Sequence, residues 1–393
     1  ALDDKTVQFK LTEPTPYFLQ LLDGAKPIRE DKYEKWGDKY GSSVDKIVVN
    51  GPFKVKSWNQ NVKMTLVKND KYWDAENVKL EKIERRVMQN TGTAAQSFLS
   101  GQIDVFSTND PNWKNAIKQR SNARLVTTPG AAPEFLGFNC DNKYFKNPKI
   151  RLAFSLSIDR KAYVRDIVEG DGKPLYSMMP DNIQCGGKLY TNRVNEENYI
   201  IKKLKEKYPD PRKLLIEGLK EEGLNPDPAE MEVHYATRGT GERSKRNAEW
   251  LRQHWNEKLG VTITIDMMEW NRMWDKVDQK DYDIVTAGWG PYYNDPSALL
   301  GISDPEDGYF DSSKSGWDSA NAQKYHELLQ KASEITDSQK RAELFLEAEK
   351  LLVGKGVIAP TYIGISSTFL AEDVGGYYIS PHAYTDYTEI FKK

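Results

Sequence analysis

Long apolar runs are missing from this chain of 393 residues, and no stretch approaches the ~18 to 20 consecutive apolar residues that a membrane-spanning helix needs. An excess of positive charge is missing as well, because 56 basic residues stand against 58 acidic ones. Binding to a polyanion requires a net or strongly clustered excess of Lys and Arg. The composition therefore predicts a soluble protein without a nucleic-acid partner.

Cysteine is scarce, with only Cys140 and Cys185 in the chain. Their spacing fits neither a CxxC pair nor the Cys/His arrangement of a zinc site. Two thiols do not fix the redox compartment, and one disulfide or two unpaired cysteines are equally open. The chain also starts at Ala1 without a charged-then-apolar leader, so we expect either that a targeting segment has been removed or that the sequence is a fragment.

Motifs of catalysis and of cofactor binding are missing too. The four histidines lie far apart in the sequence and form no HExxH spacing. No GxSxG pattern, no Walker-type phosphate loop and no GxGxxG pattern after a strand occurs. The sequence therefore predicts neither an enzyme nor a metal site, and no cofactor.

Alternating strands and helices are the strongest positive pattern. Apolar residues recur at every second position in residues 231–235 and 261–267, and a further strand is expected over residues 282–287. Between these strands, residues 248–259 form an amphipathic pattern that Gly260 ends, and a second helix carries Trp270 and Trp274. This order predicts a mostly parallel sheet with helices on its faces, and hence an α/β protein with more than one lobe.

Shorter signals flank this region. Val7, Phe9 and Leu11 predict a short strand, and residues 51–68 predict a hairpin around a polar turn. The remaining expected elements are a helix over 92–100, strands over 103–106 and 134–140, a helix over 148–168 and two helices within 321–353.

Aromatic residues are abundant, with ten Trp and 21 Tyr. Gly288, Trp289 and Gly290 follow directly on the predicted strand over 282–287. In an open α/β sheet, ligands bind at the carboxyl ends of the strands, and glycines let a ligand approach the backbone. We therefore interpret Trp289 as a wall of a ligand site, whereas Trp255 and Trp58 are expected to pack in the core.

Four stretches then carry a resemblance to a known family, namely residues 50–74, 97–106, 138–160 and 282–296. Together they resemble the extracellular solute-binding proteins of ABC importers, in the large family 5 that includes oligopeptide- and dipeptide-binding proteins. The resemblance implies a periplasmic-binding-protein-like α/β fold, in which two lobes joined by hinge strands enclose the ligand. It also implies that the chain is incomplete at its N-terminus.

The resemblance assigns domains as well. Residues 1–28 are similar to the end of the extra domain that large members carry. Residues 29–131 are similar to part of the first lobe, to which residues 385–393 return, and residues 132–384 are similar to the second lobe.

The resemblance also carries over site residues by position. Trp270, Trp274 and Trp289 match positions that line the ligand cavity, and Gly288 matches a position whose backbone pairs with the ligand main chain. In the remaining matches, Tyr384 corresponds to a tyrosine near the hinge and Asn109, with a one-residue ambiguity against Thr108, corresponds to a polar contact of the first lobe. The aromatic cluster after the strand adds Tyr292 and Tyr293 as candidate ligand contacts.

This sequence departs from the family pattern at two charged positions. Tyr292 stands where peptide-binding relatives place an Asp for the ligand's amino group, and Thr286 stands where some members use an Arg for its carboxylate. A buried ammonium without a carboxylate partner is unfavourable. A neutral ligand such as an oligosaccharide therefore remains an alternative to an oligopeptide.

The resemblance thus favours an extracytoplasmic, monomeric binding protein that lies in the periplasm or is lipid-anchored outside the cytoplasmic membrane. It would deliver an oligopeptide, or an oligosaccharide, to the permease of an ABC importer. A hydrolase would need a nucleophile–base pair or a metal cluster, which the sequence does not offer. A chaperone-like or adhesin-like interaction protein would instead present an exposed apolar patch.

Overall fold

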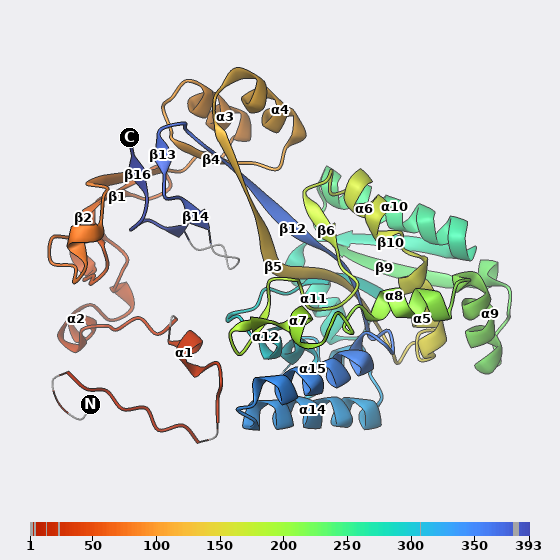
Figure 1. Ribbon diagram of the computed structural model, residues 1–393. Coiled ribbons are helices and arrows are strands. Elements are labelled where there is room, and N and C mark those ends of the chain that lie inside the picture. Colours follow the sequence, from red (N-terminus) through yellow and green to blue (C-terminus); the bar gives the residue numbers. More distant parts are fainter. Residues whose placement is uncertain (1–2, 4, 13, 23, 307, 380–384) are drawn as a thin grey trace. The chain divides into compact units, whose positions relative to one another are not determined.

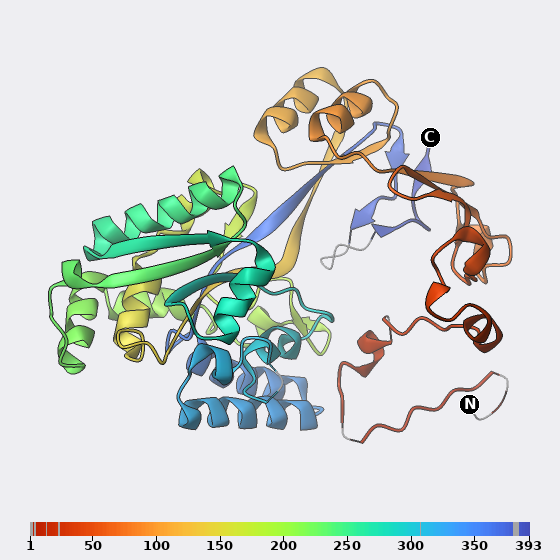
Figure 2. The same ribbon diagram turned by 180° about the vertical axis from the view of Figure 1, so that it is seen from behind.

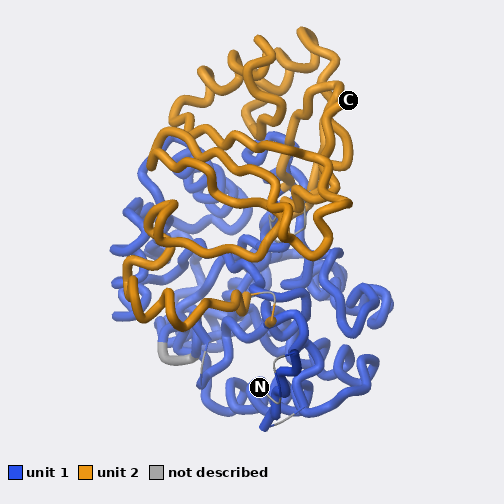
Figure 3. The backbone as a smooth tube through the Cα atoms, turned by 90° about the vertical axis from the view of Figure 1, so that its left-hand side faces the viewer, with its two compact units in different colours: residues 1–21, 131–364 blue, residues 22–130, 365–393 orange. Residues whose placement is uncertain are grey.

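The computed structural model describes residues 1–393 apart from residues 1–2, 4, 13, 23, 307 and 380–384. Its contacts divide the chain into two compact units, residues 1–21 with 131–364 and residues 22–130 with 365–393 (Figure 3). The chain passes from one unit to the other within two long strands, β5 (Arg124–Phe138) and β12 (Ile358–Leu370). The contacts place residues 365–379 with the smaller unit, whereas the resemblance assigns them to the second lobe.

A mixed sheet forms the centre of the larger unit, in the order β10-β9-β11-β5-β12, with β6 (Gly172–Pro174) beside β12. β9 (Glu232–Arg238), β10 (Thr262–Met268) and β11 (Ile284–Gly288) are parallel. β11 pairs with β5 in the antiparallel sense, and so does β6 with β12. The prediction of a parallel sheet is therefore confirmed for the three strands whose pattern suggested it, and wrong for the strands beside them.

Two helices connect the parallel strands. α10 (Glu242–Leu259) joins β9 to β10, α11 (Trp270–Asp278) joins β10 to β11, and Figures 1 and 2 show them on opposite faces of these strands. The face of α10 that the periodicity predicted is buried, and the indole N–H of Trp255 donates to the Phe154 carbonyl at 3.2 Å. The helix ends at Gly260, whose φ of 78° lies in the left-handed region that glycine favours. The core role of Trp255 is confirmed.

Several helices begin at an Asn-Pro or Asp-Pro pair. The side-chain oxygen caps the first free N–H groups, and the proline fits the first helical position because that N–H needs no partner. The helix expected over 148–168 is two helices, because Asp159 caps a second one.

The other helices of this unit are α1 (Phe18–Leu21), α5 (Pro148–Ser157), α6 (Arg160–Asp166), α7 (Tyr190–Arg193), α8 (Ile200–Lys207), α9 (Pro211–Glu221), α12 (Pro296–Leu300), α13 (Ser312–Ser315), α14 (Ser319–Glu334) and α15 (Ser338–Leu352). The short strands β7 (Gln184–Cys185) and β8 (Lys188–Leu189) pair with each other.

An antiparallel sheet of β1 (Phe53–Asn59), β2 (Lys63–Lys68) and β3 (Lys82–Arg86) belongs to the smaller unit. β1 and β2 form the predicted hairpin, with Asn61 at a φ of 61° in its turn and Trp58 only half-buried. A separate small core gathers around Phe98, Phe106 and Phe369. The remaining elements are α2 (Glu30–Trp36), α3 (Thr91–Leu99), β4 (Val105–Ser107), α4 (Pro111–Arg120), β13 (Val374–Gly375), β14 (Tyr378–Ile379), β15 (Thr385–Asp386) and β16 (Phe391–Lys392).

The strand predicted near the N-terminus is wrong. In the described part of residues 1–21, the only pairing of this kind is an isolated bridge between Asp3 and Thr6. Val7, Phe9 and Leu11 are 64%, 56% and 42% exposed. An alternating apolar pattern makes a strand only where a neighbouring strand supplies hydrogen bonds and a core receives the apolar face.

Both cysteines are free thiols in the structure, and both are buried. Burial raises the pKa of Cys140 and of Cys185 to about 11, so neither thiol is activated as a nucleophile. The sequence left open either one disulfide or two unpaired cysteines, and in the structure the two cysteines are unpaired. Within the described ranges, none of the helices combines the length and the apolar character that crossing a bilayer requires.

One carboxyl group is buried deep in the larger unit. Glu349 of α15 is fully buried, and its Oε1 accepts hydrogen bonds from the Ser177 hydroxyl at 2.5 Å and the Met178 N–H at 2.6 Å. Burial raises the pKa of Glu349 to about 7, against the opposing effect of these hydrogen bonds. The charged form is therefore disfavoured in the folded protein.

We expect Glu349→Gln to flatten the pH dependence of stability. The pKa of Glu349 is about 7 in the folded protein and lower in the unfolded chain. Its contribution to the unfolding free energy is therefore most favourable below pH ~4.5 and is lost as the pH rises through 7. The wild-type protein should lose on the order of 3 kcal/mol of unfolding free energy between pH 4.5 and pH 8 through this group. Urea unfolding at several pH values measures it, with Glu343→Gln on the exposed side of α15 as control. Parallel pH profiles of wild type and Glu349→Gln would contradict the expectation.

Candidate functional site

The carboxyl ends of β9, β10 and β11 meet at one edge of the sheet, as parallel strands require. β9 ends at Arg238, β11 ends at Gly288, and Trp270 starts the helix that follows β10. The Arg238 guanidinium lies 5.5 Å from the centre of the Trp270 ring. The structure therefore brings Trp270 and Gly288 to the same edge, where the sequence analysis expected a ligand.

An ion pair stands in the middle of this edge. β5 runs beside β11 so that Glu134 pairs with Gly288, and Arg238 Nη2 donates to Glu134 Oε1 at 2.5 Å. A Cβ added to Gly288 would lie 2.9 Å from Glu134 Oε1, so the carboxylate packs directly over the glycine. Burial raises the pKa of Glu134, and Arg238 opposes that rise.

A continuous series of aromatic rings runs along the same end of the unit. Trp270 contacts Trp274 with ring centres 5.6 Å apart, and Trp274 contacts Tyr309 at 4.5 Å. Trp289 stacks on Tyr309 at 5.8 Å and meets Tyr292 edge-on at 5.9 Å. Trp270 is 42% exposed and Tyr292 is 84% exposed, whereas Trp274 is 7% exposed. Tyr309 in the middle of the series is 41% exposed, so the series exposes ring surface there as well as at its two ends.

Hydrogen bonds to α12 and to a buried arginine hold the loop after β11 in place. Trp289 donates its indole N–H to the Ala298 carbonyl at 2.8 Å, and Asp295 caps α12. Asp295 also forms two hydrogen bonds with the guanidinium of Arg341, at 2.9 and 3.0 Å, and both side chains are buried. The buried pair joins residues 46 positions apart in the sequence.

Tyr293 lies apart from the series of rings. It stacks on Tyr17 with ring centres 4.4 Å apart, and its hydroxyl is 3.3 Å from Ser297 Oγ. Asn109 belongs to the smaller unit, where both ends of its amide are engaged by the backbone of Ile365 and Ser367. Tyr384 lies outside the described residues. The structure therefore gathers Trp270, Trp274, Gly288, Trp289 and Tyr292 and does not place the other three with them.

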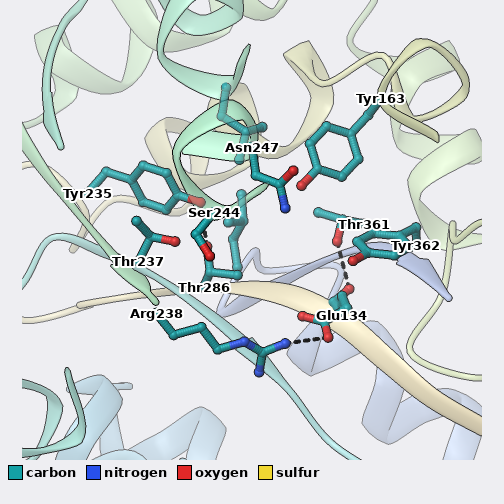
Figure 4. Close-up of a pocket in the computed structure, with 12 residues that line it drawn as sticks. Glu134, Tyr163, Tyr235, Thr237, Arg238, Ser244, Asn247, Thr286, Thr361 and Tyr362 are labelled. Atoms are coloured by element: carbon teal, nitrogen blue, oxygen red, sulfur yellow. Dashed lines mark hydrogen bonds and ion pairs between the residues drawn. The ribbon is translucent and has the colours of Figure 1, made fainter. Parts of the chain in front are cut away.

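A polar cavity of about 90 Å³ opens beside the ion pair (Figure 4). It lies between the face of the sheet that carries Glu134 and Thr286 and the helix α10, and the hydroxyls of Tyr163 and Tyr235 also line it. Thr286, which the resemblance matches to an Arg of some family members, hydrogen-bonds to the Tyr235 hydroxyl. In the part of the chain that the structure describes, no group of three or more His, Cys, Asp or Glu side chains could hold a metal.

Sequence reasoning missed Glu134 and Arg238. One signal was present, because Glu134 is the charged first residue of a strand pattern over 134–140 that is otherwise mainly apolar. Its partner lies 104 positions away in the sequence, and only the sheet order brings the two together.

Residues 1–311 match the family described as bacterial extracellular solute-binding proteins, family 5. The chain belongs to this family. It is 30% identical over 389 residues to the oligopeptide-binding protein OppA of Bacillus subtilis, covering 96% of this chain and 67% of that protein. It therefore spans about two thirds of the length of that curated relative.

Solved structures agree with this assignment of the family. The structure of Listeria monocytogenes OppA bound to peptide is 25% identical with a TM-score of 0.68, covering 97% of this chain and 72% of that one. An unliganded, open form of the murein tripeptide-binding protein MppA is 21% identical with a TM-score of 0.75, covering 98% and 71%. The predicted periplasmic-binding-protein-like α/β fold is confirmed, as are a non-enzymatic solute-binding role and an extracytoplasmic location for this family member.

We expect Asp295→Asn to destabilise the larger unit. The substitution keeps the helix cap but leaves the buried Arg341 without its counter-charge, which typically costs about 3 to 5 kcal/mol of unfolding free energy. Urea unfolding measures the loss. Asp337→Asn changes an exposed cap of α15 in the same way and should have little effect, because Asn caps a helix as well as Asp does. Equally small losses in both variants would show that the buried pair contributes little net stability.

Proposed function

We propose that this chain is the ligand-capturing component of an ABC importer, and that its ligand is an oligopeptide. The relatives support this proposal, because OppA of Bacillus subtilis is named an oligopeptide-binding protein and Listeria monocytogenes OppA was solved with a peptide. The observation that carries it is the end of β11, whose pairing with β9 stops at Val285, so that Gly288 lies beyond that ladder, near the Glu134–Arg238 pair and the Trp270 ring.

A peptide suits this arrangement for a physical reason. Main-chain N–H and C=O groups need partners when they leave water, and a strand end supplies such partners without regard to the peptide's sequence. In the proposed complex, the exposed Trp270 and Tyr292 rings pack against apolar side chains of the peptide. The indole N–H and the phenol hydroxyl at the edges of these rings stay in contact with water. Glu134 and Arg238 are paired with each other beside Gly288, so the main chain rather than a charged terminus is the part of the peptide that this strand end suits.

An oligosaccharide is the second candidate. Tyr292 and Thr286 replace the two charged anchors of peptide-binding relatives, and stacked rings also suit sugars. The strand end favours the peptide, since β11 pairs with β9 only as far as Val285 and a sugar has no main-chain amides to pair with the strand beyond that point. Native mass spectrometry of the full-length protein as purified separates the two candidates by the mass of a co-purified ligand.

Further parts of the proposal rest on the family alone. The two compact units are proposed to correspond to the two lobes, with the hinge in β5 and β12, where the chain passes between the units. We propose that the protein delivers its ligand to the permease of the importer and that it acts as a monomer.

We expect Trp289→Ala to weaken peptide binding by about 1 to 3 kcal/mol, because the ring contributes stacking area and supports Tyr292. Isothermal titration of the full-length protein with a co-purified or screened peptide measures this. Trp73→Ala removes an indole that is 86% exposed in the smaller unit and serves as the matched control. Unchanged affinity in Trp289→Ala, with the fold intact by circular dichroism, would remove Trp289 from the site.

A further inference from the structure

A second cavity lies on the larger unit, where the ends of several helices meet. It has a volume of about 560 Å³ and lies between the C-terminal ends of α5, α8 and α10 and the N-terminal end of α9. Lys205, Asp210 and Lys258 supply its charged lining. No residue that we propose to contact the peptide lines it, so the proposed peptide binding leaves this cavity without a role.

Lys205 of α8 is a half-buried lysine in the wall of this cavity. Its Nζ donates to the Ile158 carbonyl at 2.9 Å, and among the described residues no carboxylate forms an ion pair with it. A carbonyl oxygen accepts a hydrogen bond from a neutral amine as well as from an ammonium. The contact that holds Lys205 therefore does not require the charged form of the side chain.

A buried positive charge acts on Lys205 from the protein interior. Arg160 is 1% exposed, and its guanidinium donates to the carbonyls of Pro360 and Ser155 at 2.7 and 2.9 Å and to the Ser155 hydroxyl at 3.2 Å. These acceptors are neutral, and no carboxylate in the described part of the chain contacts this guanidinium. A second cation is unfavourable beside one that has no counter-charge.

Two carboxylates lie near Lys205 or in the cavity wall, and both cap helices. Asp159 caps α6 and Asp210 caps α9 by accepting backbone N–H groups. Burial and the Arg160 charge lower the pKa of Lys205 to about 8, and Asp159 opposes this only in part. At about pH 8, roughly half of Lys205 is therefore the neutral, nucleophilic amine, against less than about 1% of an ordinary lysine.

We propose that Lys205 is a site of reversible modification by carbon dioxide. This inference is independent of the proposed peptide binding. Carbon dioxide fits this position among small electrophiles because it enters without charge and leaves a carboxylate on the nitrogen. That carboxylate carries the sign of charge that Arg160 and Lys258 favour, since Lys258 is exposed on the cavity wall and forms no ion pair with any described carboxylate.

The reaction balances without a further reagent. The lone pair of the Lys205 amine forms a bond to the carbon of carbon dioxide, and one C=O electron pair moves onto its oxygen. The nitrogen then loses one proton to water, which gives a carbamate and a hydronium ion. The N–H that remains on the nitrogen can keep the hydrogen bond to the Ile158 carbonyl.

The test equilibrates the full-length protein with carbon dioxide at about pH 8 and traps carbamates as ethyl esters with triethyloxonium. Mass spectrometry of the digested protein then gives the occupancy of each lysine. We expect an occupancy at Lys205 about tenfold or more above that of Lys207, which is exposed on the same helix. Equal occupancy at the two lysines, or no carbamate at Lys205, would overturn the proposal.

A variant separates the reactivity of the amine from the stabilisation of the product. Lys258→Ala should lower the carbamate occupancy at Lys205 by about threefold or more, because the new carboxylate loses a nearby cation. Acetic anhydride leaves a neutral amide, so its reaction with Lys205 should persist in this variant. Lys245→Ala removes another exposed lysine of α10 and should change neither result. Acetylation of Lys205 in a protein that forms no carbamate there would show a reactive amine and would overturn its assignment to carbon dioxide.

Discussion

The buried pair of Asp295 and Arg341 is the interaction on which the ligand-facing end of the larger unit depends. Both charges are out of water, so each is tolerable only in the presence of the other. Asp295 also begins α12, and α12 supplies the carbonyl that holds the Trp289 indole. The chain that leaves β11 is therefore held to α12, and Trp289 is positioned by contacts within the protein.

The fold was predictable where its signals are local. Residues 231–287 form the expected strands and helices because the apolar face of each element can be recognised from the spacing of its own residues. The antiparallel neighbour of β11 was not predictable, since β5 lies about 150 positions earlier and no residue pattern encodes its direction. The strand predicted from Val7, Phe9 and Leu11 was wrong for a related reason. An alternating pattern indicates that a segment has an apolar face, but it does not indicate whether a partner strand exists.

Part of the site could be predicted in the same way. The rule that ligands gather at the carboxyl ends of parallel strands leads to Gly288 and Trp270 once three strands are assigned. Glu134 and Arg238 come from two separate strands and meet only through the sheet order. Tyr292 and Tyr293 are neighbours in sequence, yet one is exposed beside Trp289 and the other stacks on Tyr17. That difference follows from the turn into α12, which residue types alone do not specify.

Side chains alternate along β11, so the two faces of its end have different surroundings. Thr286 and Gly288 share a face with Glu134 of β5, whereas Val285 and Ala287 are buried toward the opposite face. The Glu134 carboxylate packs over Gly288, so a ligand does not reach the glycine from that face. Because the pairing of β11 with β9 ends at Val285, a peptide bound as proposed would instead meet the strand along its edge.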